Sequence, residues 1–344
     1  MKKYRNSFNL SDTLITAVVI IFLVGFSMLT VWIIRGLSVV DPAASLSSGQ
    51  PESSEESYES SYAEGEGDIQ QSDALTSDTV DMDTYTILDI ENDAITRGDL
   101  ILINKDHEYI FSEEDVFTPI YGNKNQGYKV SYATITLNQP TLDALNAFML
   151  DFSEETGRRN IQVISGFRSY ETQEELYNSR VAKQGEEEAS RLTARPGHSE
   201  HHSGYAVDFN LLTNNGTQEI TNEGDYTWVY EHAHEYGFIQ RYSNEKSDLT
   251  GISDEPWHFR YVGIPHASVM TERGYCLEEY MQYLLGFPFG VSHLTVTGPD
   301  EKEYEIYYVA ANTTGSTTSI PVPNKGSYTV SGNNADGFIV TITK

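Results

Sequence analysis

The order of apolar and polar positions divides the chain into three regions of different character. Residues 14–34 are uncharged and dominated by Leu, Ile, Val and Phe, a run long enough to cross a hydrocarbon core of about 30 Å. Residues 35–83 are rich in Ser, Glu and Asp and almost free of large aliphatic side chains. Apolar alternation resumes near Tyr85. The pattern therefore predicts a transmembrane helix at 14–34, a disordered acidic stalk at 35–83 and a folded region from residue 84 onward.

Basic residues around the apolar run set its expected orientation. Lys2, Lys3 and Arg5 precede the run, whereas only Arg35 follows it closely. Because positive charge favours the cytoplasmic flank, we expect residues 1–13 in the cytoplasm and the folded region outside, in a single-pass protein of the cell membrane. A cleaved signal peptide is the alternative, although the run ends in large residues rather than in a small-residue cleavage site.

Apolar alternation, or for 161–166 a short buried apolar run, predicts short strands in the folded region. The segments concerned are 98–111, with a turn at 104–107, then 161–166, 205–211 and a short strand after Gly237. Beyond residue 286, apolar and polar residues alternate again between Gly, Asn and Pro. We expect a small all-β extension at 286–344, and the sequence leaves open whether it serves packing or attachment.

Helical spacing separates these strands. One helix is expected from Pro140, with Thr141 as a possible cap, and others at 171–184, 227–237 and 271–285. On the helix at 171–184, the apolar face is expected to hold Leu176, Tyr177 and Val181. Because no regular strand–helix–strand repeat occurs, the expected fold class is α+β.

Composition narrows the possible classes of function. The formal net charge is −29 at pH 7, which argues against a nucleic-acid partner because phosphate backbones are bound through clustered Lys and Arg. The chain has one cysteine, Cys276. A structural zinc site built from several thiolates is therefore excluded.

Two short segments carry the residue types of a catalytic zinc site. SEHHSGYAVDF spans 199–209, and EPWHFRYVG spans 255–263. Catalytic zinc keeps three protein ligands with N or O donors and leaves one position for water. The segments predict a site for one zinc ion, held by His201, Asp208 and His258.

Strand geometry supports Asp208 as a ligand. Successive side chains of a strand alternate between faces, so Ala206 and Asp208 share one face, while Val207 and Phe209 share the other. The small side chain of Ala206 leaves room beside Asp208, and Gly204 permits the close approach of the preceding loop.

Glu255 is the predicted general base, because it lies near His258 while Pro256 separates the two. An alternative makes Glu255 a ligand and Asp208 a structural residue. His202 also competes for the ligand role, and spacing alone does not exclude it.

Orienting a substrate requires further polar groups. Arg168 lies in a turn after the strand at 161–166, where a guanidinium can bind a carboxylate or an oxyanion. Ser199 can donate a hydrogen bond to a substrate carboxylate. For either residue alone, a structural ion pair or a loop hydrogen bond is the commoner explanation, and both gain weight from their closeness to the metal segments in sequence.

Three blocks of sequence resemble a known family in their order and spacing. SGFRSYETQ, PGHSEHHSGYAVDF and EPWHFRYVG are similar to the signature blocks of VanY-type D-alanyl-D-alanine carboxypeptidases. These enzymes belong to the LAS group of zinc metallopeptidases, and the resemblance covers roughly residues 84–285. It implies a small antiparallel sheet flanked by helices, with zinc held on the sheet.

The resemblance also implies a role for each residue. It assigns the zinc ligands to His201, Asp208 and His258, the base to Glu255, the stabilisation of the carbonyl or terminal carboxylate to Arg168, carboxylate binding to Ser199, and pocket lining to Gln173. His202 departs from the family pattern, in which Gln is frequent.

The implied reaction is hydrolysis of the C-terminal D-alanine from peptidoglycan stem peptides. Two alternatives remain open from the sequence: an L,D-carboxypeptidase or endopeptidase with the same zinc chemistry, and a zinc-containing wall-binding module without turnover. For the β extension, the attachment role would then be weak binding to the cell wall.

Overall fold

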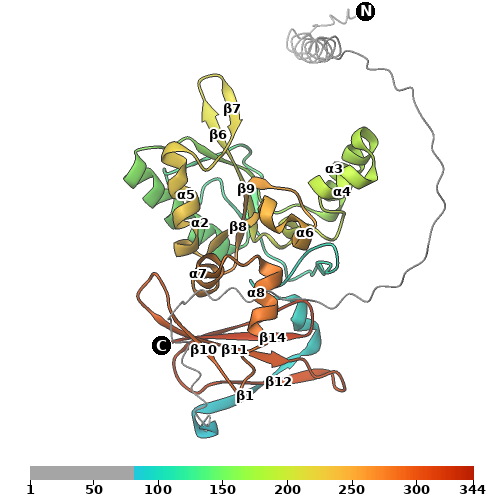
Figure 1. Ribbon diagram of the computed structural model, residues 1–344, viewed down its shortest axis with the longest axis vertical. Coiled ribbons are helices and arrows are strands. Elements are labelled where there is room, and N and C mark those ends of the chain that lie inside the picture. Colours follow the sequence, from blue (N-terminus) through green and yellow to red (C-terminus); the bar gives the residue numbers. More distant parts are fainter. Residues whose placement is uncertain (1–80) are drawn as a thin grey trace, which may run out of the picture. The chain divides into compact units, whose positions relative to one another are not determined.

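The computed structural model describes residues 81–344 (Figure 1). The expected cytoplasmic tail at 1–13, the expected transmembrane helix at 14–34 and all but the end of the expected stalk lie outside the described residues. Within residues 81–344, no helix combines the length and the apolar character needed to cross a bilayer.

A six-stranded sheet carries both histidine-containing segments. Its strands follow the order β3-β5-β6-β9-β8, with β7 paired to β6, and every pair except β3 with β5 is antiparallel. The strands are β3 (Lys129–Val130), β5 (Ile161–Ser165), β6 (Ala206–Thr213), β7 (Gly216–Glu219), β8 (Phe238–Tyr242) and β9 (Glu255–Tyr261). A separate short pair joins β2 (Thr118–Pro119) and β4 (Thr136–Leu137). The sheet mixes with helices as the α+β expectation requires.

Helix α2 (Gln139–Thr156) supplies much of the core beneath this sheet. Its side chains Leu145 and Phe148 are fully buried and share one apolar cluster with Val207 and Phe209 of β6. The alternation expected for this strand is therefore confirmed, because Asp208 instead lines a cavity. Asn138 rather than Thr141 is the residue before the helix, so the expected cap was wrong.

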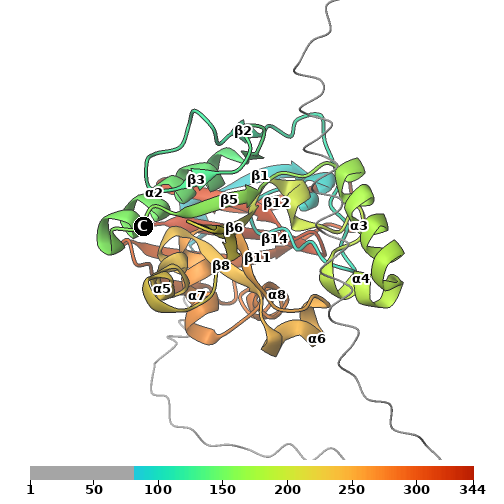
Figure 2. The ribbon, with the colours of Figure 1, turned by 90° about the horizontal axis from the view of Figure 1, so that it is seen from above.

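Helices α3 (Tyr170–Gln184) and α4 (Glu186–Leu192) lie on the side of β6 and β8 away from α2 and α5 (Thr227–His232) in both views (Figures 1 and 2). The helix expected at 171–184 is thus confirmed, but its expected apolar face is not. Leu176 is 38% exposed, and Gln173 is the buried residue of α3. The face toward the protein borders a cavity rather than an apolar core.

The segment at 98–111 is not the expected strand, although its turn is present. Asn104 and His107 exchange backbone hydrogen bonds at the predicted turn. The preceding residues are buried without a ladder, because their backbone groups bond to loops and side chains. Leu102 N–H donates to Asn333 O, and the Arg260 guanidinium donates to Ile101 O.

The helix expected at 271–285 is two helices. Helix α7 (Ile264–Arg273) ends at Gly274, and α8 (Leu277–Leu284) begins after Cys276. The strand after Gly237 is β8, as expected. The short helix α6 (Ser247–Thr250) lies between β8 and β9.

The C-terminal extension is all-β, as the alternation predicted. A four-stranded sheet has the order β10-β11-β14-β13, built from β10 (Leu294–Thr297), β11 (Glu303–Ala310), β13 (Ser327–Gly332) and β14 (Gly337–Thr343). Strand β12 (Thr317–Pro323) pairs instead with β1 (Tyr85–Glu91). The chain near Tyr85, at the start of the region 84–285 that the resemblance covers, therefore pairs with the β extension. Local alternation does not encode this pairing across more than two hundred residues.

Candidate active site

His201 is presented by a short 3-10 helix, Glu200–Ser203, that ends at Gly204 in the left-handed conformation. The imidazole is 3% exposed. Its Nδ1 lies 2.7 Å from Gly166 O, so this nitrogen carries the proton that the carbonyl accepts. The other nitrogen, Nε2, is left as a lone-pair donor, and it lies 3.1 Å from Asp208 Oδ2.

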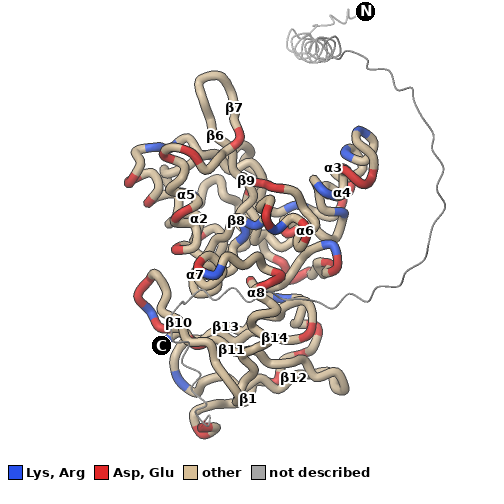
Figure 3. Tube along the Cα trace, in the orientation of Figure 1, with Lys and Arg blue, Asp and Glu red and all other residues tan. Residues whose placement is uncertain are grey.

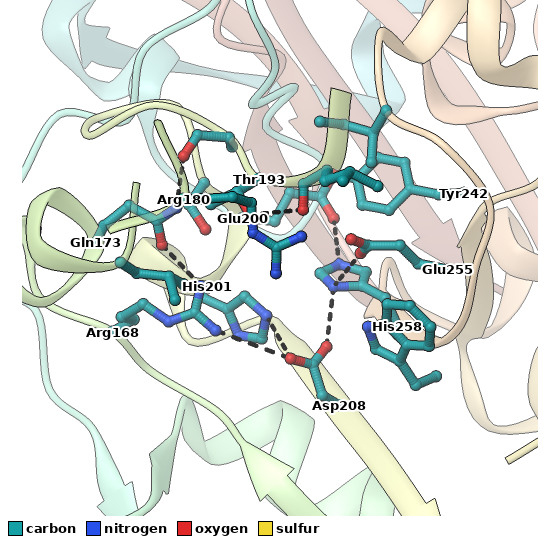
Figure 4. A pocket seen from close by; sticks show the side chains of 16 residues that line it. Arg168, Gln173, Arg180, Thr193, Glu200, His201, Asp208, Tyr242, Glu255 and His258 are labelled. Carbon is teal, nitrogen blue, oxygen red and sulfur yellow. Dashed lines mark hydrogen bonds and ion pairs between the residues drawn. The ribbon is translucent and has the colours of Figure 1, made fainter. Parts of the chain in front are cut away.

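Asp208 and His258 come together through strand register. They are direct partners in the antiparallel pair of β6 and β9, and His258 Nδ1 lies 3.0 Å from Asp208 Oδ1. Donor atoms of His201, Asp208 and His258 all lie within 4.8 Å of one another, and all three residues are buried. The structure thus brings together the three residues predicted as ligands (Figure 4).

This donor set fits a metal cation. Two imidazole nitrogens and one carboxylate oxygen are N and O ligands of the kind that zinc takes in catalytic sites. Asp208 Oδ1 is buried and makes no hydrogen bond of good geometry, although His258 is near. A buried acceptor of this kind is costly without a partner, and a cation bound between the three residues would satisfy it.

Glu200 contacts the ring nitrogen of His258 that faces away from Asp208, a role that sequence reasoning missed. Glu200 Oε2 lies 3.2 Å from His258 Nε2, which leaves Nδ1 for the metal position. Its Oε1 accepts from Arg241 Nε at 2.8 Å and from an Arg260 amino group at 2.9 Å. Although burial opposes ionisation, the two guanidinium groups hold the pKa of Glu200 well below its usual range. A carboxylate behind a ligating histidine orients the ring and raises its basicity.

Glu255 lies at the start of β9, beside the metal ligands. Its Oε2 is 3.7 Å from His258 Nδ1, and it is not part of the three-residue cluster. Burial raises the pKa of Glu255 to about 7. A carboxylate with a pKa near neutrality can both accept and return a proton, which is the requirement for a general base and acid.

Arg168 is held in place by the protein. One amino group donates to Gln173 Oε1 at 2.7 Å and the other to Ser165 Oγ at 2.9 Å. The second amino group also lies 3.8 Å from Asp208 Oδ2. Arg168, Gln173 and Ser199 all line the same cavity as the three metal-ligand candidates, so every residue predicted for the site borders one space.

His202, which competed for the ligand role, and the nearby His198 have other partners. His202 Nδ1 lies 2.7 Å from Arg168 O, and Gly197 N–H donates to His202 Nε2. Burial lowers the pKa of His202 to about 4, in keeping with a neutral ring that braces the Arg168 backbone. His198 contacts Asn104 O. Neither belongs to the cluster at His201.

Several further residues of the cavity had no assigned role from the sequence. Arg180 of α3 and Tyr242 of β8 line it, together with Trp257 of β9. The cavity has a volume of about 140 Å³. Helical spacing places Arg180 seven residues after Gln173, which would have identified it had the cavity-facing side of α3 been known.

Two histidines and an aspartate, held by strands β6 and β9 and the adjoining 3-10 helix beside the half-buried Glu255, form the kind of site that metal-dependent peptidases use. The family model described as VanY, D-alanyl-D-alanine carboxypeptidase, matches residues 134–264. A D-alanyl-D-alanine carboxypeptidase of Enterococcus faecium is 34% identical over 259 residues, which cover 74% of this chain and 78% of the relative. The chain belongs to the VanY family of D-alanyl-D-alanine carboxypeptidases, as the resemblance of its sequence blocks indicated.

Two further relatives bear on the same conclusion. The bifunctional D-Ala-D-Ala dipeptidase and D-Ala-D-Ala carboxypeptidase VanXYC of Enterococcus gallinarum is 36% identical over 130 residues, 37% of this chain and 68% of the relative. The crystal structure of the vancomycin resistance D,D-dipeptidase VanXYg, in complex with a D-Ala-D-Ala phosphinate analogue, superposes with a TM-score of 0.67 at 32% identity. It covers 76% of this chain and 99% of that structure. The expectation of a peptide hydrolase is confirmed.

Proposed function

We propose that this chain is a zinc-dependent D,D-carboxypeptidase that removes the C-terminal D-alanine from peptidoglycan stem peptides. The observation that carries the proposal is the convergence of His201, Asp208 and His258 beside Glu255, in a chain of the VanY family. Names of the relatives support the preference for D-Ala-D-Ala ends.

In this proposal His201 Nε2, one Asp208 oxygen and His258 Nδ1 would hold one zinc ion. When bound, the ion supplies Lewis-acid polarisation of the scissile carbonyl and lowers the pKa of a water molecule to about 7. Gly166 and Glu200 keep the two rings in the tautomers that this binding needs.

Glu255 moves the proton. It accepts a proton from the attacking water as the new C–O bond forms, and it returns that proton to the D-alanine nitrogen as the C–N bond breaks. The products are free D-alanine and a peptide shortened by one residue.

Arg168 and its neighbours orient the substrate. The guanidinium of Arg168, fixed by Gln173, faces the cavity where the carbonyl oxygen or the terminal carboxylate would lie. Ser199 is 4% exposed and borders the same space, so its hydroxyl can donate to the carboxylate. Groups that are held in advance stabilise developing charge without reorganising during the reaction.

We further propose that residues 14–34 anchor the chain in the cell membrane and that residues 35–83 form a stalk. The catalytic part would then act outside the cytoplasm, where nascent wall is found. The uncharged run and its basic N-terminal flank support this placement.

Replacing the proposed base tests the mechanism. In Glu255→Gln, hydrolysis of a pentapeptide should fall by roughly 10²- to 10⁴-fold because general acid–base transfer is lost. Zinc content, measured by atomic absorption, should remain that of the unaltered protein. Full activity in the variant would refute the assignment of Glu255 as base.

A product assay separates the possible peptide bonds. Purified protein is incubated with pentapeptide and tetrapeptide stems, with and without a chelator, and the products are identified by mass. We expect D-alanine from the pentapeptide, lost with the chelator and restored by zinc. Release from the tetrapeptide alone would identify an L,D-carboxypeptidase, and no release from either stem would favour a binding module.

A further inference from the structure

Helix α3 turns two polar side chains and one apolar side chain toward the cavity. Gln173, Leu176 and Arg180 all line it, and their spacing of three, four and seven residues places them on one side of a helix. Charged residues of both signs lie along α3 and α4 (Figure 3). The side of α3 that would ordinarily pack into a core therefore forms a wall of the active site.

Arg180 is a positively charged residue of this wall. Its guanidinium points into the middle of the cavity (Figure 4), and among residues 81–344 it has no hydrogen bond or ion pair. Arg168, by contrast, is engaged by Gln173, Ser165 and Asp208. Arg180 and Glu255 border the same cavity (Figure 4).

The charges around the cavity create a need for such a cation. Asp208 and Glu255 are carboxylates that border it, and both would repel an anionic substrate end. The charge of Glu200 is already balanced by Arg241 and Arg260. A substrate carboxylate therefore requires a positive group that the protein has not otherwise used.

We propose that Arg180 binds the C-terminal carboxylate of the substrate and thereby selects peptides with a free C-terminus. In the terminal residue, this carboxylate is attached to the same Cα as the scissile nitrogen. Any side-chain carboxylate of an earlier residue lies farther from the scissile bond, by up to about 3.6 Å of extended chain per residue. Arg180, which borders the cavity together with Glu255, is therefore placed to meet the terminal carboxylate before any other carboxylate of the peptide. A planar guanidinium can bind its two oxygens together.

The proposal rests on the proposed carboxypeptidase function and gives the two arginines of the cavity separate roles. Arg180 would hold the terminal carboxylate with Ser199, and Arg168 would remain at the reacting carbonyl. An endopeptidase has no use for such a group, because its substrate continues beyond the scissile bond.

The test compares one pentapeptide with a free C-terminus and the same pentapeptide amidated there. For Arg180→Gln, kcat/KM on the free acid should fall roughly 10- to 100-fold, mainly through KM, as expected for the loss of a charge-assisted contact. Activity on the amide should change little. Arg180→Lys, which retains the charge but not the planar fork, should recover part of the preference.

Lys183→Gln is the matched control, because Lys183 lies on the same helix and does not border the cavity. It should leave the ratio of acid to amide unchanged. An unaltered ratio in Arg180→Gln would overturn the proposal.

Binding provides an arm that does not depend on turnover. In the Glu255→Gln background, calorimetry with N-acetyl-D-alanyl-D-alanine should show the same 10- to 100-fold weakening when Arg180→Gln is added. Equal affinities would overturn the role of Arg180. Failure of the unaltered chain to release D-alanine would instead overturn the proposed function, so the two failures are distinguishable.

Discussion

Each of the two histidines proposed as metal ligands depends on a partner for its second ring nitrogen. His201 is oriented by the Gly166 carbonyl, and His258 is oriented by Glu200. Glu200 is fully buried and forms ion pairs with Arg241 and Arg260. Arg241 forms a further ion pair with Glu278, with 2.7 Å between nitrogen and oxygen. A buried set of charges of this kind tolerates the loss of a member poorly, because the remaining charges keep their desolvation cost.

We therefore expect Glu200→Gln to affect both folding and metal binding. The free energy of unfolding should fall by about 3–5 kcal/mol because the buried Arg260 loses the carboxylate that pairs with it, and the buried Arg241 keeps only Glu278. Zinc affinity, measured by competition with a chelator, should fall roughly 10- to 100-fold because His258 loses its orienting carboxylate.

Glu279→Gln is the corresponding control, since Glu279 pairs with Lys246 at a partly exposed position. It should leave both quantities nearly unchanged. If Glu200→Gln behaved like this control, the orienting role of Glu200 would be wrong.

At the scale of elements, the turn after the 3-10 helix Glu200–Ser203 sets the position of His201. Gly204 has a φ of 70°, in the left-handed region that favours glycine. Its carbonyl accepts from Asn138 N–H at 3.0 Å, which ties the turn to the start of α2. A Cβ at this position would lie 2.7 Å from the Phe117 ring and 2.9 Å from the Asn138 nitrogen.

Gly204→Ala should consequently cost more than backbone strain alone. Gly274 offers a matched control, because it is also left-handed, with a φ of 63°, and a Cβ there would meet nothing within 4 Å. We expect Gly274→Ala to lower the unfolding free energy by about 1–2 kcal/mol. Gly204→Ala should lower it further and also weaken zinc binding. Equal effects in a urea titration and a zinc assay would show that the close contacts at Gly204 are relieved without moving His201.

At the scale of the whole described region, the β extension and the catalytic part share a core. Leu277, Tyr280 and Leu284 of α8 are buried in one cluster with Ile306 of β11 and Ile339 of β14. His266 of α7 lies in the same place, 2.8 Å from the Tyr280 hydroxyl and 2.9 Å from Thr341 Oγ1. Packing is therefore a definite role of the extension.

Burial of His266 makes this junction sensitive to pH. Burial lowers the pKa of His266 to about 3, from 6.5. Because the unfolded chain binds the proton more readily, the neutral ring contributes stability that is complete above about pH 6.5 and is lost as the pH falls toward about 3. Between pH 7.5 and pH 5, the loss from this group should be about 2 kcal/mol.

His266→Gln should reduce that loss. The measurement is the free energy of unfolding at the two pH values in chelator-treated protein, so that metal release does not contribute. His232→Gln, at a partly exposed histidine paired with Glu235, should keep the full dependence. If the free energy of unfolding fell as much between the two pH values in His266→Gln as in the unaltered protein, His266 would not be the source of the pH dependence.

The sequence by itself determined the residue types of the site and the local elements that carry them. Metal chemistry restricts ligands to a few side chains, and strand alternation separates Asp208 from Val207, so the motifs and their faces could be predicted from neighbours a few residues apart. The resemblance of three blocks to the VanY family then favoured His201 over His202 as the zinc ligand. The strands of the extension followed from period-two alternation in the same way.

Only the tertiary structure decided how distant segments meet. Glu200 is adjacent to His201 in sequence, but its partners Arg241 and Arg260 lie on strands β8 and β9. The cavity-facing side of α3, which includes Arg180, depends on what the helix packs against. The pairing of β1 with β12 likewise arises from long-range contacts. Periodicity reports which residues share a face, whereas packing of the whole chain determines what that face meets.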